Sequence, residues 1–167
     1  MRNSYNKPEL KSLYYEEEVE KLPSLDGKTI AITGTTSGTG FIAAKTIAEK
    51  GARTLLLNRK TYRSNRSYDL LKEHSPKANF VDIECDLQSF KSVKKAAKTI
   101  TDLCKDGLDV LCNNAGVMAL KDQATIDGFD IQMQTNHLSH FLLTKQLLPL
   151  LETTAEKRGE ARIVNHT

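Results

Sequence analysis

The sequence predicts an α/β protein built on one doubly wound parallel sheet of about five strands, with helices on both faces. Short apolar runs alternate with segments of helical periodicity from residue 28 to residue 165. The first run passes directly into Gly34, Gly38 and Gly40, after which helical spacing resumes. Ligands of such sheets bind at the carboxyl ends of the strands, so these glycines predict a binding site there.

The composition is that of an ordinary globular chain. The 167 residues suffice for one domain with a sizeable core, and 39% of them are apolar and 27% charged. A net charge of +3 is too small to favour nucleic acid or an anionic membrane surface as a partner. No apolar run approaches the roughly 18 residues of a transmembrane helix, and the start is not basic and then apolar. We therefore expect a cytoplasmic or organelle-matrix protein.

Metal-ligand residue types are present without metal-ligand spacing. Cys85, Cys104 and Cys112 form an odd set with no CxxC pair, which predicts reduced core thiols. His137 and His140 lie three residues apart without an acidic or Cys partner nearby, so we expect packing or surface histidines. The sequence predicts no metal site.

The chain divides into an N-terminal extension, residues 1–27, and a domain over residues 28–167. The extension is polar and predicts one short helix over residues 8–21. Pro23 and Gly27 separate that helix from the domain.

Strands are predicted where apolar and β-branched residues dominate short runs. The second run, ARTLLLN, is apolar almost without interruption, as expected for a parallel strand covered on both faces. The predicted strands cover residues 28–33, 52–58, 79–84, 108–112 and 162–165.

Helices are predicted between these strands, over residues 41–50, 67–74, 89–105 and 130–151. The third has apolar residues at threes and fours with lysines between them, which predicts an amphipathic helix. The last is apolar on almost all sides from Leu138 onward, so we expect neighbours on several sides. Pro149 lacks an N–H group and is expected to end or bend this helix.

The glycines after the first strand predict a phosphate site. The first turn of a helix carries unpaired N–H groups and the positive end of the helix dipole. Gly34 can make the tight turn, Gly38 removes a Cβ that would face the phosphates, and Gly40 lets the helix lie close to the strand. The alternative is a glycine-rich loop that binds nothing.

The end of the second strand favours NADP over NAD. A site for unphosphorylated ribose usually has an acidic residue there, but Asn58, Arg59 and Lys60 follow the strand and no carboxylate comes before Asp69. A guanidinium group suits a 2′-phosphate because it can make paired, charge-assisted hydrogen bonds. The alternative is a solvated turn after a buried strand.

Two further strand ends carry polar residues. Asp86 could accept a hydrogen bond from an adenine amino group or cap the next helix, and both can hold at once. Residues 113–116, Asn-Asn-Ala-Gly, offer two amides and a small turn on which a ribose or nicotinamide could lie. The same four residues are also ordinary turn chemistry.

Together these residues resemble the short-chain dehydrogenase/reductase family in its classical NADP-using form. Residues 33–40 match its T-G-x-x-x-G-x-G pattern, Asp86 its adenine-contacting Asp, and residues 113–116 its N-N-A-G. The segment TNHLSHFLLT resembles the helix that carries the family's catalytic Asn, here Asn136, with wording similar to the retinol-dehydrogenase and protochlorophyllide-reductase branch. The resemblance covers residues 28–166.

The resemblance implies a Rossmann fold and hydride transfer with NADP(H) to or from a carbonyl, an alcohol or a conjugated double bond of an apolar small molecule. Asn136 would then be catalytic, by bending the helix and holding a water molecule; the alternative is a polar residue that bonds to backbone inside a helix. The implied cofactor-binding residues are Gly34, Thr36, Ser37, Gly38, Thr39, Gly40, Arg59, Asp86, Leu87, Asn114, Ala115 and Gly116.

The chain departs from the family at two places. Thr39 replaces the usual aliphatic residue between the last two glycines. The family also places a catalytic Ser after the fifth strand and Tyr-x-x-x-Lys on the next helix, and the sequence stops at Thr167 before either. We therefore expect a truncated chain that is inactive alone and that self-associates through an incomplete sheet edge. The alternative is a non-catalytic dinucleotide-binding or regulatory protein.

Tyr68 and Lys72 reproduce the Tyr-x-x-x-Lys spacing elsewhere in the sequence. They fall between the second and third strands, on a helix that should pack on the sheet away from the nicotinamide. Because geometry decides which groups can transfer a proton, we expect no catalytic role for this pair. We expect Tyr68 to pack within its helix and Lys72 to be solvated.

Overall fold

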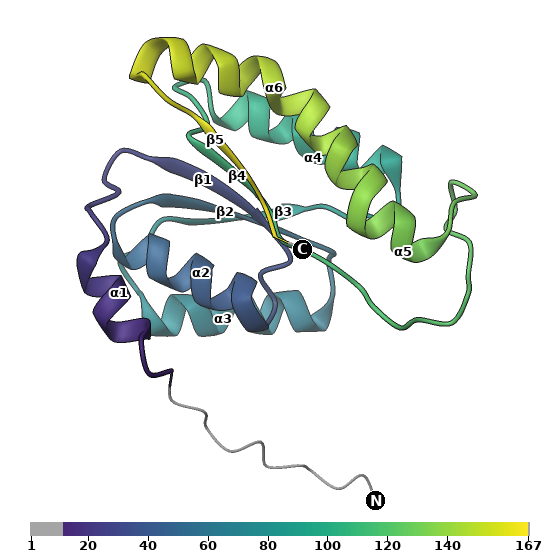
Figure 1. Cartoon of the computed structure of the whole chain (residues 1–167), viewed down its shortest axis with the longest axis horizontal. Helices are drawn as coiled ribbons and strands as arrows, with labels where there is room; N and C mark the ends of the chain where they lie inside the picture. The colour runs from purple at the N-terminus through teal and green to yellow at the C-terminus, as the bar shows by residue number, and fades with distance from the viewer. Residues whose placement is uncertain (1–11, 167) are drawn as a thin grey trace, which may run out of the picture.

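The computed structural model describes residues 12–166 and confirms the predicted α/β fold. One parallel sheet has the strand order β3-β2-β1-β4-β5 (Figure 1). Its strands are β1 (Thr29–Thr33), β2 (Arg53–Asn58), β3 (Phe80–Glu84), β4 (Val110–Asn113) and β5 (Arg162–Asn165). The order reverses beside β1, so the crevice of this doubly wound sheet lies at the carboxyl ends of β1 and β4.

Helices cover both faces of the sheet. α2 (Gly38–Glu49) and α3 (Tyr62–His74) lie on one face, and α4 (Phe90–Leu103) and α6 (Ser139–Arg158) lie on the other (Figure 1). Successive strand residues point to opposite faces, so Ile30 and Ile32 join the core under α2 and α3, whereas Ala31 joins the core under α4 and α6. Each fully buried Leu or Ile stabilises these cores by about 1.5–3 kcal/mol.

α3 begins earlier than the prediction from residue 67. Thr61 accepts a hydrogen bond from the backbone N–H of Ser64, and the Ser64 side chain accepts one from the backbone N–H of Thr61. This reciprocal capping box satisfies two donors at the helix start. The residues that follow are polar, so apolar periodicity did not indicate this first part of the helix.

The long helix after β4 is continuous but not uniform. It begins as α5 (Ile131–Met133), widens into a π-helical turn, η1 (Gln134–Leu138), and continues as α6. We predicted that Pro149 ends or bends this helix near its last turns. Pro149 does not end the helix, because α6 continues to Arg158. It stops at Gly159, whose φ of 86° is left-handed. Pro149 lies on the exposed side, while Leu147 and Leu151 are buried on either side of it.

The extension contributes α1 (Tyr15–Lys21). A helix was predicted over residues 8–21, of which residues 8–11 lie outside the described residues, and residues 12–14 are not helical. The Ser12 side chain accepts a hydrogen bond from the backbone N–H of Tyr15, where the helix starts. The hydroxyl groups of Tyr15 and Thr46 lie 2.5 Å apart, and Lys50 donates to the carbonyl oxygen of Leu22. α1 therefore docks on α2.

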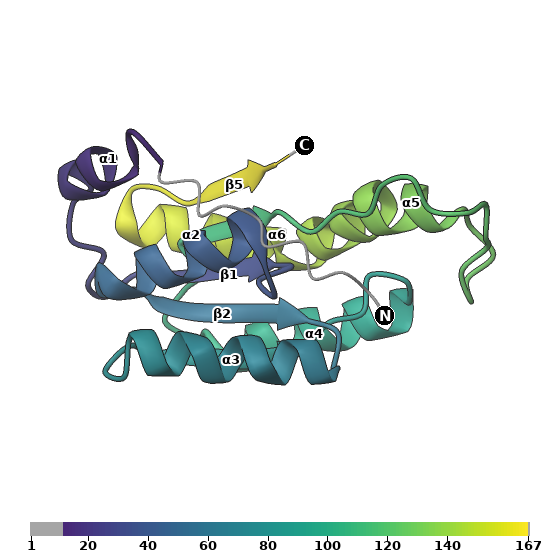
Figure 2. The ribbon, with the colours of Figure 1, turned by 90° about the horizontal axis from the view of Figure 1, so that it is seen from below.

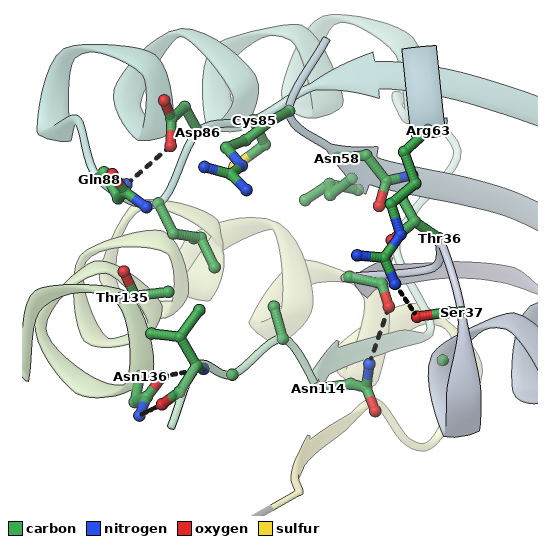
Figure 3. A pocket seen from close by; sticks show the side chains of 18 of the residues that line it. Thr36, Ser37, Asn58, Arg63, Cys85, Asp86, Gln88, Asn114, Thr135 and Asn136 are labelled. Atoms are coloured by element: carbon green, nitrogen blue, oxygen red, sulfur yellow. Dashed lines mark hydrogen bonds between the residues drawn. The ribbon is translucent and has the colours of Figure 1, made fainter. Parts of the chain in front are cut away.

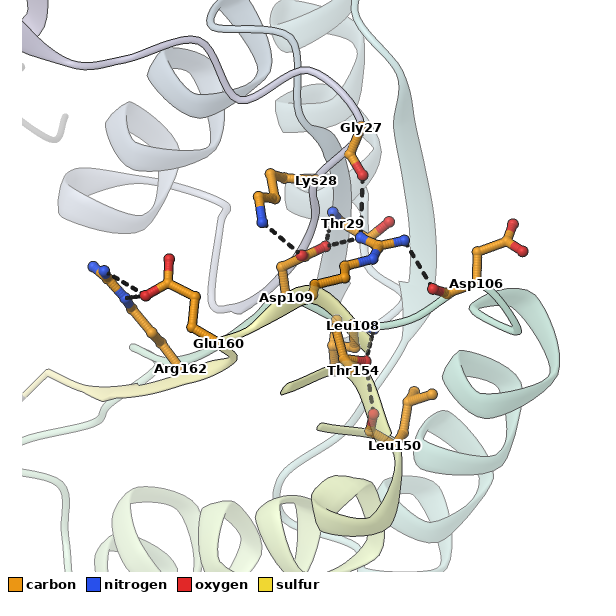
Figure 4. Close-up of polar contacts among 11 residues, drawn as sticks. Gly27, Lys28, Thr29, Asp106, Leu108, Asp109, Leu150, Thr154, Glu160 and Arg162 are labelled. Atoms are coloured by element: carbon orange, nitrogen blue, oxygen red, sulfur yellow. Dashed lines mark hydrogen bonds and ion pairs between the residues drawn. The ribbon is translucent and has the colours of Figure 1, made fainter. Parts of the chain in front are cut away.

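A buried carboxylate joins three elements at the amino ends of the strands, whereas the crevice lies at their carboxyl ends. Figure 4 shows its contacts. Asp109 precedes β4 and is only 4% exposed. It accepts hydrogen bonds from the Lys28 ammonium, the Thr29 backbone N–H and the Arg158 guanidinium, at 3.1, 2.8 and 2.7 Å. Burial alone would raise the pKa of Asp109, but these hydrogen bonds outweigh it and the pKa is lowered.

We predict that Asp109→Asn lowers the free energy of unfolding near pH 7 by about 1–3 kcal/mol, because an amide N–H₂ would face these donors. A carboxyl whose pKa is lowered by folding stabilises the protein above its unfolded pKa of about 3.9 and loses that effect as the pH falls through the folded value. The difference between the two proteins should therefore shrink below about pH 4.

Urea denaturation followed by circular dichroism at several pH values measures this. The matched control is Asp102→Asn, which removes an exposed pair with Lys98 and should change stability by less than about 0.5 kcal/mol. Equal losses in the two variants would contradict the role of the buried carboxylate.

Candidate nucleotide-binding site

A cavity of about 810 Å³ opens at the carboxyl ends of β1 to β4 (Figure 3). All but one of the residues predicted to bind the cofactor border it, together with the predicted catalytic Asn136. These are Gly34, Thr36, Ser37, Thr39, Gly40, Arg59, Asp86, Leu87, Asn114, Ala115 and Gly116. The exception is Gly38, which begins α2 and is not among the residues that border the cavity.

Gly34 and Gly40 allow the turn after β1 to touch the end of β4. Gly34 has a φ of 73°, and a Cβ built on it would lie 2.8 Å from the Cα of Ala115. A Cβ on Gly40 would collide with the carbonyl oxygen of Gly34 and the side-chain nitrogen of Asn114. Close contact therefore requires glycine at both positions, and at Gly34 the left-handed backbone conformation requires it as well.

The start of α2 faces the cavity as an anion site. Ser37 is its N-cap residue, and within the described part of the chain its side chain makes no capping hydrogen bond. The first N–H groups of this 12-residue helix therefore remain available to a ligand. With the positive end of the helix dipole, they can bind a phosphate.

The Asn114 side chain joins three segments at the cavity floor. Its amide nitrogen donates to the carbonyl oxygens of Thr33 and Gly34, at 2.9 and 3.3 Å. Figure 3 shows one hydrogen bond of this amide. Its oxygen lies 3.0 Å from Nδ1 of His166, another residue that borders the cavity. Asn114 thus fixes the glycine turn relative to the ends of β4 and β5.

The end of the cavity beside β2 is basic. Arg59 and Arg63 border it, and Arg63 donates a 2.7 Å hydrogen bond to Ser37 (Figure 3). Lys60 is not among the residues that border the cavity, and Asn58 is buried and bonded to Thr35 through both ends of its amide. Sequence reasoning missed Arg63 because it placed the start of α3 too late; the Thr61–Ser64 capping pair is the signal that could have found it.

Asp86 and Leu87 form the wall beside β3. Asp86 accepts a 3.0 Å hydrogen bond from the backbone N–H of Gln88 (Figure 3). The N-cap of α4 is Ser89, which accepts from the N–H of Ser92, so the interpretation of Asp86 as the cap of this helix is wrong. Asp86 instead stabilises the turn that precedes the helix, because its side chain reaches the N–H two residues on.

Asn136 lies in the π-helical turn η1 and faces the cavity. Its amide makes two 2.8 Å hydrogen bonds with the backbone of Val117, accepting from the N–H and donating to the carbonyl oxygen (Figure 3). Asn136 thus bonds to backbone, as the alternative interpretation expected, but to the backbone of the segment after β4 and not to that of its own helix. Wide turns of this kind occur frequently at functional sites.

Tyr68 and Lys72 lie on α3, and neither is among the residues that border the cavity. Tyr68 packs against the core that contains Leu71 and Phe80, as predicted. Lys72 donates a 3.0 Å hydrogen bond to the carbonyl oxygen of Ala78, and its ammonium lies 5.6 Å from the centre of the Phe80 ring. The prediction that Lys72 is simply solvated is wrong.

The three thiols are free and buried or partly buried, as expected. Burial, with a smaller effect of the Asp86 charge, raises the pKa of Cys85 to about 12. Burial also raises the pKa of Cys104 and of Cys112. Within residues 12–166, no group of three or more His, Cys, Asp or Glu side chains could hold a metal ion.

Comparison with known proteins identifies the family. A family model described as short chain dehydrogenase matches residues 28–167, so the chain belongs to the short-chain dehydrogenase/reductase family, as the motifs predicted. Short-chain dehydrogenase TIC 32 A, chloroplastic, of Brassica napus is 39% identical over 145 residues, 85% of this chain and 45% of that protein. Human Retinol dehydrogenase 13 is 35% identical over 136 residues, 81% of this chain and 40% of that protein.

The fold is also found among solved structures. The Pseudomonas aeruginosa RhlG/NADP active-site complex superimposes with a TM-score of 0.69 and 30% identity, covering 84% of this chain and 54% of that one. The chain spans less than half the length of the two curated relatives above. Among the described helices, none is both long and apolar enough to cross a membrane.

We predict that Gly40→Ala destabilises the protein by about 1–3 kcal/mol, because the added methyl group would displace backbone or Asn114. The loss should appear although Ala favours helices over Gly. Thermal unfolding measures it. The control is Gly116→Ala at the same cavity, where the new Cβ would lie 3.6 Å from Asn136, an ordinary contact. A Gly40→Ala protein as stable as this control would contradict the close approach of the two segments.

We also predict that Cys85 resists alkylation. At pH 8 a thiol with a pKa of about 12 is almost entirely protonated, and the thiolate is the reactive form. Iodoacetamide should label Cys85 in the folded protein at least about 100-fold more slowly than free cysteine. Mass spectrometry of peptides measures the rate, and labelling in urea is the control. Rapid labelling of the folded protein would refute the burial of this thiol.

Proposed function

We propose that residues 28–167 form the cofactor-binding part of an NADP-dependent oxidoreductase. The observation that carries the proposal is one cavity that joins the open N-terminus of α2 to two arginines beside β2. A dinucleotide with an added 2′-phosphate carries its charges at these two places, whereas NAD lacks the second.

The cavity residues suggest how the cofactor would be held. The N–H groups at the start of α2 would bind the pyrophosphate, and Arg59 and Arg63 would bind the 2′-phosphate. Asp86 and Leu87 would lie beside the adenine. The nicotinamide would lie over Ala115 and Gly116, toward Asn136. When bound, the cofactor supplies or accepts the hydride.

We infer an apolar small-molecule substrate with a carbonyl, an alcohol or a conjugated double bond. The segment between β4 and α5 supports this, because Met118 borders the cavity and is 87% exposed. Ile126 and Phe129 are also exposed on this segment, which projects beyond the sheet together with α5 (Figures 1 and 2). A relative named for retinol, an apolar alcohol, supports the same substrate class.

The 167-residue chain is proposed to bind cofactor without turnover. The family's Tyr-x-x-x-Lys pair would exchange a proton with the substrate, and the only described pair with that spacing, Tyr68 and Lys72, lies on α3 away from the cavity. The position of the Tyr68–Lys72 pair equally favours the second candidate function, a dinucleotide-binding protein that catalyses no reaction. NADPH consumption with a panel of aldehydes and ketones tests this, and measurable turnover by the 167-residue chain would refute it.

We predict that the protein binds NADPH more tightly than NADH. Arg59→Ala and Arg63→Ala should each weaken NADPH binding about 10- to 100-fold, which corresponds to a hydrogen bond to a charged group. NADH binding should change by less than about threefold, because NADH lacks the 2′-phosphate. Fluorescence titration measures both constants.

The matched control is Arg66→Ala, an exposed arginine of α3 that is not among the residues bordering the cavity. It should leave both constants unchanged. Equal weakening of NADPH and NADH by the first two variants would show that these arginines do not select the cofactor. A folded protein that binds neither nucleotide would overturn the proposed function.

A further inference from the structure

A buried histidine joins two of the segments that form the cavity. His140 belongs to the first turn of α6, is 6% exposed, and is not among the residues that border the cavity. Its Nδ1 lies 3.0 Å from the carbonyl oxygen of Asn136, and its Nε2 lies 2.9 Å from the hydroxyl oxygen of Thr33. The ring thus bridges the wide turn that carries Asn136 and the last residue of β1.

The Thr33 hydroxyl has more partners than a hydroxyl usually has. Its oxygen accepts hydrogen bonds from the backbone N–H groups of Asn114 and Ala115, both at 2.9 Å. A hydroxyl has two acceptor sites and one proton, and backbone N–H groups can only donate. Both acceptor sites are therefore occupied, and the hydroxyl can only donate to a further partner.

The remaining proton of Thr33 goes to His140. The other acceptor within reach is the carbonyl oxygen of Cys112, at the longer distance of 3.5 Å. Nε2 must then be an acceptor without a proton, and Nδ1 must carry the proton that it donates to Asn136. The arrangement fixes one of the two neutral tautomers of His140.

We propose that His140, in its neutral Nδ1–H form, is a positioning residue that sets the distance between Asn136 and the glycine turn of the cofactor site. The inference rests on the proposed function, because the two segments matter together only if one ligand spans them. Thr33 precedes Gly34 and also holds the backbone of Asn114 and Ala115. Through this one hydroxyl, His140 connects the phosphate side of the cavity with its nicotinamide side.

The surroundings favour the neutral ring. Burial lowers the pKa of His140; the hydrogen bond to the Asn136 backbone opposes this, and the nearby His137 adds to the lowering. A protonated ring would direct a second N–H at a hydroxyl whose acceptor sites are filled. Hydrogen-bond counting thus requires the neutral ring, and burial favours it.

Nuclear magnetic resonance on the unmodified protein tests the tautomer. Long-range correlations between ring protons and ¹⁵N distinguish the Nδ1–H form, the more common Nε2–H form and the imidazolium, and His137→Gln helps to assign the signals. We expect the Nδ1–H form near pH 7. Finding the Nε2–H form or the imidazolium there would overturn the proposal, and packing of the ring alone would not produce this signature.

Two substitutions test the positioning role through NADPH titration. His140→Phe keeps a ring but removes both the acceptor for Thr33 and the N–H donor to Asn136, and we expect it to weaken NADPH binding about tenfold. His140→Gln keeps an acceptor at the position of Nε2, and we expect binding within about threefold of the wild type. His137→Gln, at an exposed position of η1, is the matched control and should bind as the wild type does.

The outcomes separate this inference from the proposed function. If the wild type binds NADPH and the Phe and Gln variants bind it equally tightly, the positioning role is overturned. The proposed nucleotide site would still stand. Failure of the wild type to bind NADPH would overturn the proposed function and the role of His140 in it, whatever the tautomer. If the Phe variant does not fold, two measurements still test the positioning role. These are the tautomer of His140 in the wild type and the NADPH affinity of the Gln variant.

Discussion

The contact between the ends of β1 and β4 is the constraint on which the site depends. Gly34 and Gly40 have no side chain where Ala115 and Asn114 come close, and the Asn114 amide and the Thr33 hydroxyl fill the space with hydrogen bonds. Backbone groups at two strand ends are thereby satisfied inside the protein. The donors at the start of α2 stay directed outward, where a ligand can reach them.

The features that could be predicted from the sequence are those in which the backbone restricts the choice of residue. Gly34 and Gly40 could be recognised because no other residue fits at these positions. The strands could be recognised by their apolar runs, which are buried on both faces. The glycine turn and the apolar runs together predict the order of elements, the parallel sheet and the position of the crevice. The cavity residues could be named because they follow the strand ends, where such a sheet binds its ligand, and because their motifs resemble those of the family.

The other features of the site and fold depend on contacts between segments, which give a weaker signal in the sequence. Arg63 reaches the cavity only because the Thr61–Ser64 pair starts α3 early, in a stretch with no apolar pattern. Pro149 was expected to end or bend the last helix near its last turns, but α6 continues to Arg158, with Pro149 exposed and Leu147 and Leu151 buried. Asn136 bonds to Val117, and His140 bonds to Thr33 as well as to Asn136. Val117 and Thr33 lie on other segments, so these two contacts could not be predicted from spacing along one helix.

The wide turn at η1 also limits how this region can vary. A turn closed by i→i+5 hydrogen bonds contains one more residue than an α-helical turn spanning the same gap. Removing one residue between Gln134 and Leu138 could restore a regular helix, but it would rotate the preceding residues by about 100° relative to α6. The segment length is therefore as restrictive as the identity of Asn136, and transplanting the motif into another scaffold would require copying the extra residue along with the amide.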